Sequence, residues 1–517
     1  MEQRKSTIST IVVMACTVAS RLFGYVKMAL INAYFGASGP ADVINAIFII
    51  PNSLRKLFAE GAFSAAFIPV LSSTIARDAS GVEARALVRS LSAFLLLALA
   101  PLVALSLALP GPFLGLLLDF KDPAKLALAR TLLGWEFNYV LFVSLGALAM
   151  AVLNSHGRFA VSALSPLAFS LAVVLGIVFL RGSLGPVAMG VGVLAGGVLQ
   201  LAAQLPAFQR LGYTLVPAFR FDSPAFRRTI TLWAPFVASA SIFTVNQFVA
   251  QRFASGLADG SVSALQNAVT VMNLPLGIFT ASVMTVLFPK LSAHAARGEL
   301  DGLRETVGYG FEFLLALLVP ASAALALFGR EIVAVAFQRM RFTEVDTLMA
   351  ARVLCGYAAG LAALSLYTFL QRLFYALKDY RTPLASAVLV AAIDVGLSLW
   401  LKETPLRVAG LAVANSAAFF AGFVFLAAAA WRRVGGFSLR RLAAGAAKAV
   451  LATLPLAALL GVFRAVQPDL WRAGSTPRNI AWIGAAVVLS CVATLAMFAL
   501  LRMPFILELL RARRRKA

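Results

Sequence analysis

Residues 86–109 read ALVRSLSAFLLLALAPLVALSLAL, and the stretch from Ser90 to Leu109 contains no ionisable side chain. A helix needs about 20 mostly apolar residues to cross the hydrocarbon core of a bilayer. This stretch is long enough to do so once. It therefore predicts a transmembrane helix, and the question is how much of the chain behaves in the same way.

The apolar character extends over the whole chain of 517 residues, which is 61% hydrophobic and 13% charged, with a mean hydropathy of +0.88. Soluble domains average about 45–50% apolar and about 25% charged residues. This composition excludes a disordered chain or a fibrous repeat and disfavours a soluble enzyme. We predict an all-α polytopic membrane protein with fourteen spans, at approximately 8–35, 41–71, 86–109, 126–153, 159–181, 184–207, 228–254, 262–292, 304–328, 346–376, 382–401, 406–430, 442–464 and 480–502.

The distribution of Lys and Arg predicts the orientation of these spans. The segments on the side of the N-terminus hold 25 of them and the opposite segments hold 13. Cytoplasmic segments carry the excess of positive charge, so we expect both termini in the cytoplasm. The net charge of +23 follows from this bias, and no basic soluble face indicates nucleic acid. The basic tail is expected to contact anionic membrane lipids.

An internal repeat is visible in short matches. Residues 67–72 read FIPVLS and residues 287–292 read LFPKLS, while Pro51 and Pro275 both follow apolar stretches. We predict two parallel six-helix repeats around a central cavity, an N-lobe at 1–208 and a C-lobe at 209–434. Residues 435–517 then add two helices and a basic cytoplasmic tail.

Charged side chains inside the first two predicted spans are the main candidate site. Arg21, Lys27 and Arg55 are surplus positive charges, whereas Lys56 and Glu60 lie four residues apart and can pair on one helix face. Intramembrane charge is costly and marks functional sites, and Arg and Lys both bind phosphate. We therefore predict a water-filled cavity that binds an anion. The alternative is that these side chains extend, or snorkel, to the membrane–water interface.

The second half contains weaker candidates. Arg252 and Arg372 are candidates for cavity charges of the C-lobe, with an interfacial role as the alternative. Asp394 is a candidate site for a coupling ion, with Asn415 supplying a neutral oxygen; the alternative is a structural carboxylate. The two histidines and three cysteines predict no metal site, no disulfide and no cofactor. A nucleotide-binding phosphate loop is also missing, so we do not expect an enzyme.

The segment SRLFGYVKMALINAYFGASGPADVINAIFIIPNSLRKLFAEGAFSAAFIPVLS, residues 20–72, resembles the N-terminal signature of the MurJ/MviN lipid II flippases. Weaker similarity extends through FYALKDYRTP at 374–383. The family belongs to the multidrug/oligosaccharidyl-lipid/polysaccharide exporter superfamily. The resemblance implies a flippase that moves lipid II, the undecaprenyl-pyrophosphate-linked peptidoglycan precursor, to the outer leaflet for cell-wall synthesis, alongside other cell-wall machinery.

The same resemblance implies substrate contacts, and the chain departs from the family pattern in places. The family's cavity charges fall on Arg21, Lys27, Asp42, Arg55, Lys56 and Glu60. Lys27 and Lys56 stand where the family commonly has Arg. In the stretch NAVTVMNLP, Val269 and Thr270 replace the family's Asp-Arg pair.

Several functions stay open at this point. A related exporter could carry another polyprenyl-linked glycan or a small solute, and a divergent paralogue or a scaffold could transport nothing. A membrane glycosyltransferase acting on the same lipid is a further class of function. For a flippase, the excess positive charge of the empty cavity predicts that the membrane potential alone drives turnover.

Overall fold

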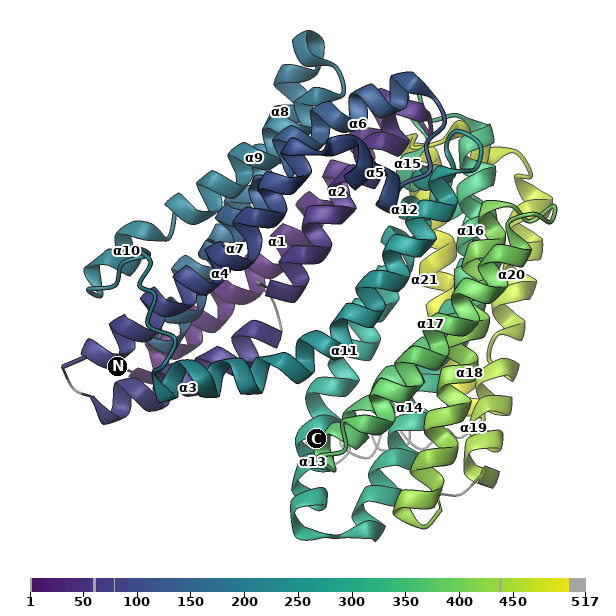
Figure 1. Ribbon diagram of the computed structural model, residues 1–517. Helices are drawn as coiled ribbons and strands as arrows, with labels where there is room; N and C mark the ends of the chain where they lie inside the picture. The colour runs from purple at the N-terminus through teal and green to yellow at the C-terminus, as the bar shows by residue number, and fades with distance from the viewer. Residues whose placement is uncertain (1, 59–61, 79, 437–438, 502–517) are drawn as a thin grey trace. The chain divides into compact units, whose positions relative to one another are not determined.

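The computed structural model describes residues 2–58, 62–78, 80–436 and 439–501 (Figure 1). All regular elements in these residues are helices, as predicted. The chain forms two compact units, Met1–Val262 and Ser263–Ala517. The predicted lobe boundary at 208/209 does not coincide with this division.

The first unit contains α1 (Glu2–Phe35), α2 (Gly39–Phe58), α3 (Ala62–Arg77), α4 (Val82–Ala108), α5 (Pro110–Leu117), α6 (Pro123–Glu136), α7 (Tyr139–Ser155), α8 (Phe159–Leu184), α9 (Val187–Ala202), α10 (Leu205–Arg210) and α11 (Pro224–Ser255). The helix α12 (Ser261–Pro275) begins at the division and leads into the second unit.

The second unit continues with the π-helix η1 (Leu276–Thr280) and then with α13 (Ala281–Arg297), α14 (Leu300–Leu327), α15 (Gly329–Phe337), α16 (Glu344–Ala376), α17 (Arg381–Leu401), α18 (Val408–Val434), α19 (Leu439–Leu451), α20 (Leu454–Val466), the 3₁₀-helix η2 (Leu470–Ala473) and α21 (Pro477–Leu500).

Each of the fourteen predicted spans coincides with one helix or with consecutive helices. Among the described residues, 11 helical segments are long and apolar enough to cross a membrane. The other three predicted spans correspond to α1, to α2 with α3, and to α11, which include the charged stretches discussed above. The all-helical membrane fold is therefore confirmed, and the number of fourteen spans stays a prediction.

The internal repeat is clearer in the helix boundaries than in the amino-acid sequence. The helix α6 begins at residue 123 and α16 at 344, α8 at 159 and α17 at 381, and α9 at 187 and α18 at 408. The offset between the two copies is thus the same, to within one position, in all three pairs. Even the short helices α5 and α15, which we did not predict, begin at nearly the same offset, at Pro110 and Gly329.

Packing explains why α11 lies in the first unit although the repeat makes it the first helix of the second copy. Trp233 of α11 is buried in an apolar cluster with Phe67 of α3, Leu91 of α4 and Phe208 of α10. Its indole Nε1 also donates a hydrogen bond of 3.4 Å to the Leu57 carbonyl of α2. Burial of these large side chains stabilises the first unit. The contacts therefore place α11 in the first unit, whereas the repeat assigns it to the second copy.

The turn that follows α7 recurs after α16 in the second copy, with a different residue at its left-handed position. Gly157 follows α7 with φ 70°, and Lys378, at the corresponding position of the second copy, follows α16 with φ 58°. The left-handed region is accessible to glycine without strain, whereas a residue with a Cβ carries a steric cost there. The second copy therefore retains a strained lysine where the first has glycine.

We expect Lys378→Gly to raise the thermal unfolding temperature of the detergent-solubilised protein, by a gain of roughly 0.5–1 kcal/mol as the strain is relieved. The reciprocal change, Gly157→Lys, should lower it by about 1 kcal/mol, because no atom lies within 4 Å of the added Cβ and only the backbone conformation opposes it. Lys378→Ala is the control, since it keeps a Cβ and should leave the temperature nearly unchanged. Equal effects of the Gly and Ala variants would contradict the assignment of strain.

Candidate functional site

Four of the six predicted N-lobe site residues can be placed with their side chains. Arg21 lies within α1, but its side chain is outside the described part, and Glu60 lies between the described ranges. The predicted pair of Lys56 and Glu60 is therefore not placed. Lys27, Asp42, Arg55 and Lys56 remain, and the structure places them in three different surroundings.

The cation cluster, as we call Lys27 and Arg55, is formed by α1 and α2. The Lys27 ammonium lies 3.7 Å from the centre of the Phe48 ring of α2, and this cation–π contact holds it against that helix. Arg55 is half-buried one turn beyond Pro51, and its Nε donates a hydrogen bond of 3.2 Å to the Asn52 Oδ1. Lys27 and Arg55 are close enough to repel each other electrostatically. An anion bound between two such cations would relieve this repulsion.

A carboxyl group that the sequence analysis did not select lies beside this cluster. Glu136, the last residue of α6, is 0% exposed and interacts electrostatically with Lys27. Neither of its carboxyl oxygens has a hydrogen-bond partner among the described residues. A single acidic residue in an apolar span is a weak candidate by its charge alone, and the sequence does not identify its partner, because only the packing of α6 brings it to Lys27.

Lys56 and Asp42 lie on the same helix as Arg55 but in different surroundings. Lys56 is exposed, one residue after Arg55. Asp42 lies in the first turn of α2, is 2% exposed, and accepts a hydrogen bond of 2.8 Å from the Gly260 backbone N–H. The resemblance implied a substrate contact for Asp42. In this structure its carboxylate holds the turn between α11 and α12.

Further contacts fix the same turn. Lys125 of α6 forms an ion pair with Asp259, and the Ser255 Oγ accepts a hydrogen bond of 2.8 Å from the Asp119 backbone N–H. Gly260 itself has φ 88° and lies against the Ala37 carbonyl, so only glycine fits there. We call Asp42, Lys125, Ser255, Asp259 and Gly260 the turn clasp.

Arg252 has a local role near the turn clasp. Its guanidinium donates to the Gly115 carbonyl and, at 3.2 Å, to the Leu118 carbonyl at the C-terminal end of α5. Carbonyls at a helix end lack intrahelical partners, so a cation there satisfies them. The structure thus accounts for Arg252 without a substrate.

In the second unit, Asp394 and Asn415 are neighbours, as predicted. Asp394 is 3% exposed, and its Oδ2 accepts a hydrogen bond of 2.8 Å from the Asn415 Nδ2. The Ser398 hydroxyl donates to its Oδ1 at 3.4 Å. Asn415 therefore presents its amide nitrogen to the carboxylate, and the neighbouring Ser416 donates to the Gly356 carbonyl. This arrangement satisfies a structural carboxylate and leaves the coupling-ion role a prediction.

Arg372 of α16 is exposed on the surface of the second unit. Its guanidinium lies 5.6 Å from the centre of the Phe288 ring of α13. Val269 and Thr270 lie in α12, where the Thr270 hydroxyl donates to the Gln266 carbonyl of its own helix at 2.8 Å. The π-helix η1 follows directly after Pro275. Arg372 is thus the candidate cation that this unit retains.

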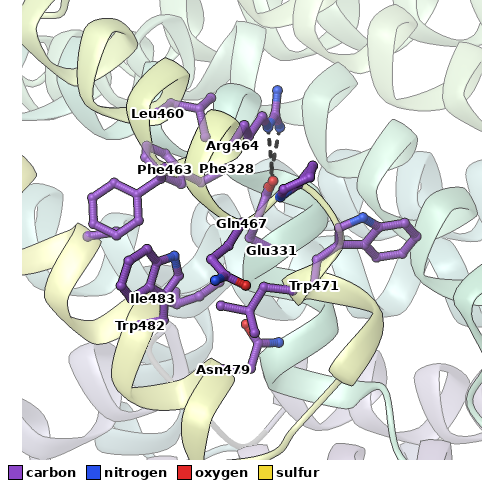
Figure 2. A pocket seen from close by; sticks show the side chains of 13 residues that line it. Phe328, Glu331, Leu460, Phe463, Arg464, Gln467, Trp471, Asn479, Trp482 and Ile483 are labelled. Carbon is purple, nitrogen blue, oxygen red and sulfur yellow. Dashed lines mark hydrogen bonds and ion pairs between the residues drawn. The ribbon is translucent and has the colours of Figure 1, made fainter.

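The C-terminal helices shape two further pockets in the second unit. Figure 2 shows a small one where α20 and α21 meet α15, lined by Trp471, Trp482 and Phe463, with Arg464 paired to Glu331 at 3.0 Å. A larger apolar groove lies among η1, α14, α20 and α21. Its lining is almost entirely hydrocarbon, including Phe279, Phe328 and Phe498.

Comparison with known proteins gives the family context of this arrangement. The chain is 30% identical over 94% of its length to a probable lipid II flippase MurJ of Borreliella burgdorferi, which it covers to 95%. It is 33% identical over 80% of its length to the corresponding probable flippase of Rhizobium meliloti, which it covers to 79%.

Solved structures share the fold. The lipid II flippase MurJ in an inward closed conformation superposes with a TM-score of 0.78 at 23% identity, covering 97% of this chain and all of that one. A multidrug resistance transporter of the MATE family gives a TM-score of 0.65 at 12% identity, covering 82% of this chain and 98% of that one. The family model described as lipid II flippase MurJ matches residues 31–482. The chain therefore belongs to the MurJ family of lipid II flippases.

Proposed function

We propose that this protein moves lipid II from the cytoplasmic to the outer leaflet of a bacterial inner membrane. The observation that carries the proposal is the cation cluster: Lys27 and Arg55 interact electrostatically in the first two membrane helices of a chain that belongs to the MurJ family. A pyrophosphate carries the charge that two adjacent cations can neutralise. Substrate recognition by the other predicted charges, including Arg21, is part of the same proposal.

The apolar groove of the second unit suits the remainder of such a substrate. A polyprenyl chain is hydrocarbon, and the groove among η1, α14, α20 and α21 offers almost no polar surface. Burial of hydrocarbon against these walls is favourable or neutral relative to lipid, so the chain can lie there without entering a polar cavity. No reaction chemistry is required for this task, and we propose a transporter without an enzymatic activity.

The lobes of the internal repeat, 1–208 and 209–434, are proposed as the units that alternate during transport. Parallel repeats in transporters commonly move against each other about a fixed site. The turn clasp is then a contact that must open in one state, because it ties the start of α12 to helices of the first copy. Asp42 acts in this view by closing the protein on one side.

We expect Arg55→Ala to abolish complementation of a flippase-depleted bacterium and to lower flipping by at least about tenfold. A hydrogen bond to a charged group contributes about 1.5–3 kcal/mol. Arg55→Lys should be milder, because charge survives while the planar guanidinium is lost. The readout is lipid II accumulation together with the amount of protein in the membrane.

Arg130→Ala is the matched control, since it removes an exposed arginine from α6. It should complement normally. Full complementation by Arg55→Ala at a normal protein level would exclude this anion site.

The proposed orientation can be tested in a variant that lacks Cys16, Cys355 and Cys491. Single cysteines at the exposed positions Ser183 and Asp469 should react with an impermeant thiol reagent added outside the cell. Cysteines at the exposed positions Ser80 and Ala296 should react only after the membrane is permeabilised. The reverse pattern at both pairs of positions would overturn the cytoplasmic placement of the termini.

The energy source follows from the charge of the cation cluster. Moving one elementary charge through the membrane potential is worth about 2.3 kcal/mol per 100 mV. Return of an empty, positively charged site toward a negative cytoplasm is therefore favoured. We expect flipping to stop when the potential is collapsed while the pH and sodium gradients are held.

Asp394→Asn is the companion variant for this experiment. It should retain flipping at full potential, since Asp394 is satisfied by Asn415 and Ser398 without an ion. Undiminished flipping without a potential, or a complete loss in Asp394→Asn, would favour an ion-coupled cycle instead.

A further inference from the structure

We propose that Glu136 is a proton-binding site, which holds a proton in this conformation and releases it when its carboxylate takes Lys27 as a counter-ion in place of an anionic substrate. The link to a substrate rests on the proposed function, whereas the protonation of Glu136 in this conformation does not.

The first argument is the surroundings of the carboxyl group. Glu136 is 0% exposed, and both of its oxygens lie without a hydrogen-bond partner among the described residues. An ionised carboxylate that is removed from water and receives no hydrogen bond costs several kcal/mol. A protonated carboxyl group in the same place is neutral and avoids most of this cost.

Packing keeps water away from the group. The helix α9 crosses α6 at Gly190, where an added Cβ would lie 2.9 Å from the Trp135 Cβ and 3.6 Å from the Glu136 Cγ. The backbone of α9 therefore closes over the end of α6. The α-helix is interrupted at Phe137 and Asn138, so Glu136 is the last residue of α6.

Among the described residues, Lys27 is the one charged group that acts electrostatically on Glu136. The helices α5, α7 and α9 contain no charged residue. On α6 itself, Lys125 is engaged with Asp259, and Arg130 is exposed. On α2, Asp42 bonds to Gly260, Lys56 is exposed, and Arg55 acts on Lys27. The charges of α4, which are Glu83, Arg85 and Arg89, lie in its first two turns, and none of them acts on Glu136.

The Lys27 ammonium can pair either with ionised Glu136 or with a bound anion. Its ammonium now lies over the Phe48 ring, and no ion pair links it to any described carboxylate. Ionisation of Glu136 would create a buried negative charge whose nearest compensation is this ammonium. An anion at the cation cluster would compete for the same ammonium. The proton on Glu136 and the anion at Lys27 are therefore positively linked, and each favours binding of the other.

The balance of the step is simple. In the empty site at higher pH, Lys27 turns from the Phe48 ring to Glu136, the O–H bond of the carboxyl group breaks and the proton passes to water. The carboxylate then carries the charge that pairs with the ammonium. When an anion returns, a proton from water reforms the O–H bond.

The first experiment is infrared spectroscopy of the purified protein in detergent, and it needs no substrate. The C=O stretch of a protonated carboxylic acid, separated from ionised carboxylates, should be present at pH 7 and missing in Glu136→Gln. Glu312→Gln, which changes an intramembrane carboxyl of α14, is the control and should keep the band. Glu136→Asp should retain the band at a shifted frequency. This variant tests the assignment if Glu136→Gln does not fold. A wild-type spectrum without a band that depends on Glu136 would overturn the proposal.

The second experiment tests the link to the anion with farnesyl pyrophosphate as the probe. It uses the Lys27→Arg background, so that the cation does not titrate, with and without Glu136→Gln. Between pH 7 and pH 10, binding should weaken with rising pH by about tenfold more in the variant that retains Glu136. This corresponds to one pKa unit of linkage. Parallel pH profiles would overturn the link. Failure of the probe to bind at any pH would count against the proposed function, and the infrared result would still decide whether Glu136 holds a proton.

Discussion

The cost of charge inside hydrocarbon is the constraint on which the first unit depends. Each charged group in a membrane helix must find a counter-charge, a hydrogen bond, water or a neutral form. Lys27, Arg55 and Glu136 meet this demand in three ways: through an aromatic ring, through an amide oxygen and, as we propose, through a proton. Lys27 interacts electrostatically with both Arg55 and Glu136. An anion that binds Lys27 therefore changes the electrostatic surroundings of both residues. Such coupling is what a transport site needs in order to respond to its substrate.

A second consequence concerns Asp42. A carboxylate in the first turn of a helix is stabilised by the helix dipole. Asp42 has this position in α2, and it also receives the Gly260 backbone N–H. An acidic residue next to a cluster of cations would weaken anion binding. The structure instead uses Asp42 to hold a turn, together with the pair of Lys125 and Asp259. The place of Asp42 among the family's cavity charges is therefore equally compatible with the closing contact that we propose.

The sequence predicted the helical membrane fold well, because long apolar stretches leave few alternatives in a bilayer. It also located Lys27 and Arg55, since charges in apolar spans are visible without a structure. It did not predict the breaks within spans, such as the one after Glu136, because apolar composition continues across them. It also missed the partner of Lys27. Glu136 lies far from it in the chain, and only the packing of α6 brings the two together. Arg252 was selected for its charge, and its role at the end of α5 depends on a short helix that the sequence did not reveal.

The repeat and the charges together explain how two similar copies can serve different purposes. The helices α6 and α16 begin at Pro123 and Glu344, so the position of Glu136 corresponds to Tyr357. Tyr357 is 8% exposed and carries no charge at neutral pH. The second copy thus repeats the helix boundaries of the first without its carboxyl group. Backbone geometry in a membrane is preserved by the length and spacing of spans, which many side chains can satisfy. A charged side chain and its partner are specific to their site, so one copy can lack them while the other retains them. Substrate recognition is therefore expected to be asymmetric, with Lys27 and Arg55 supplied by the first copy.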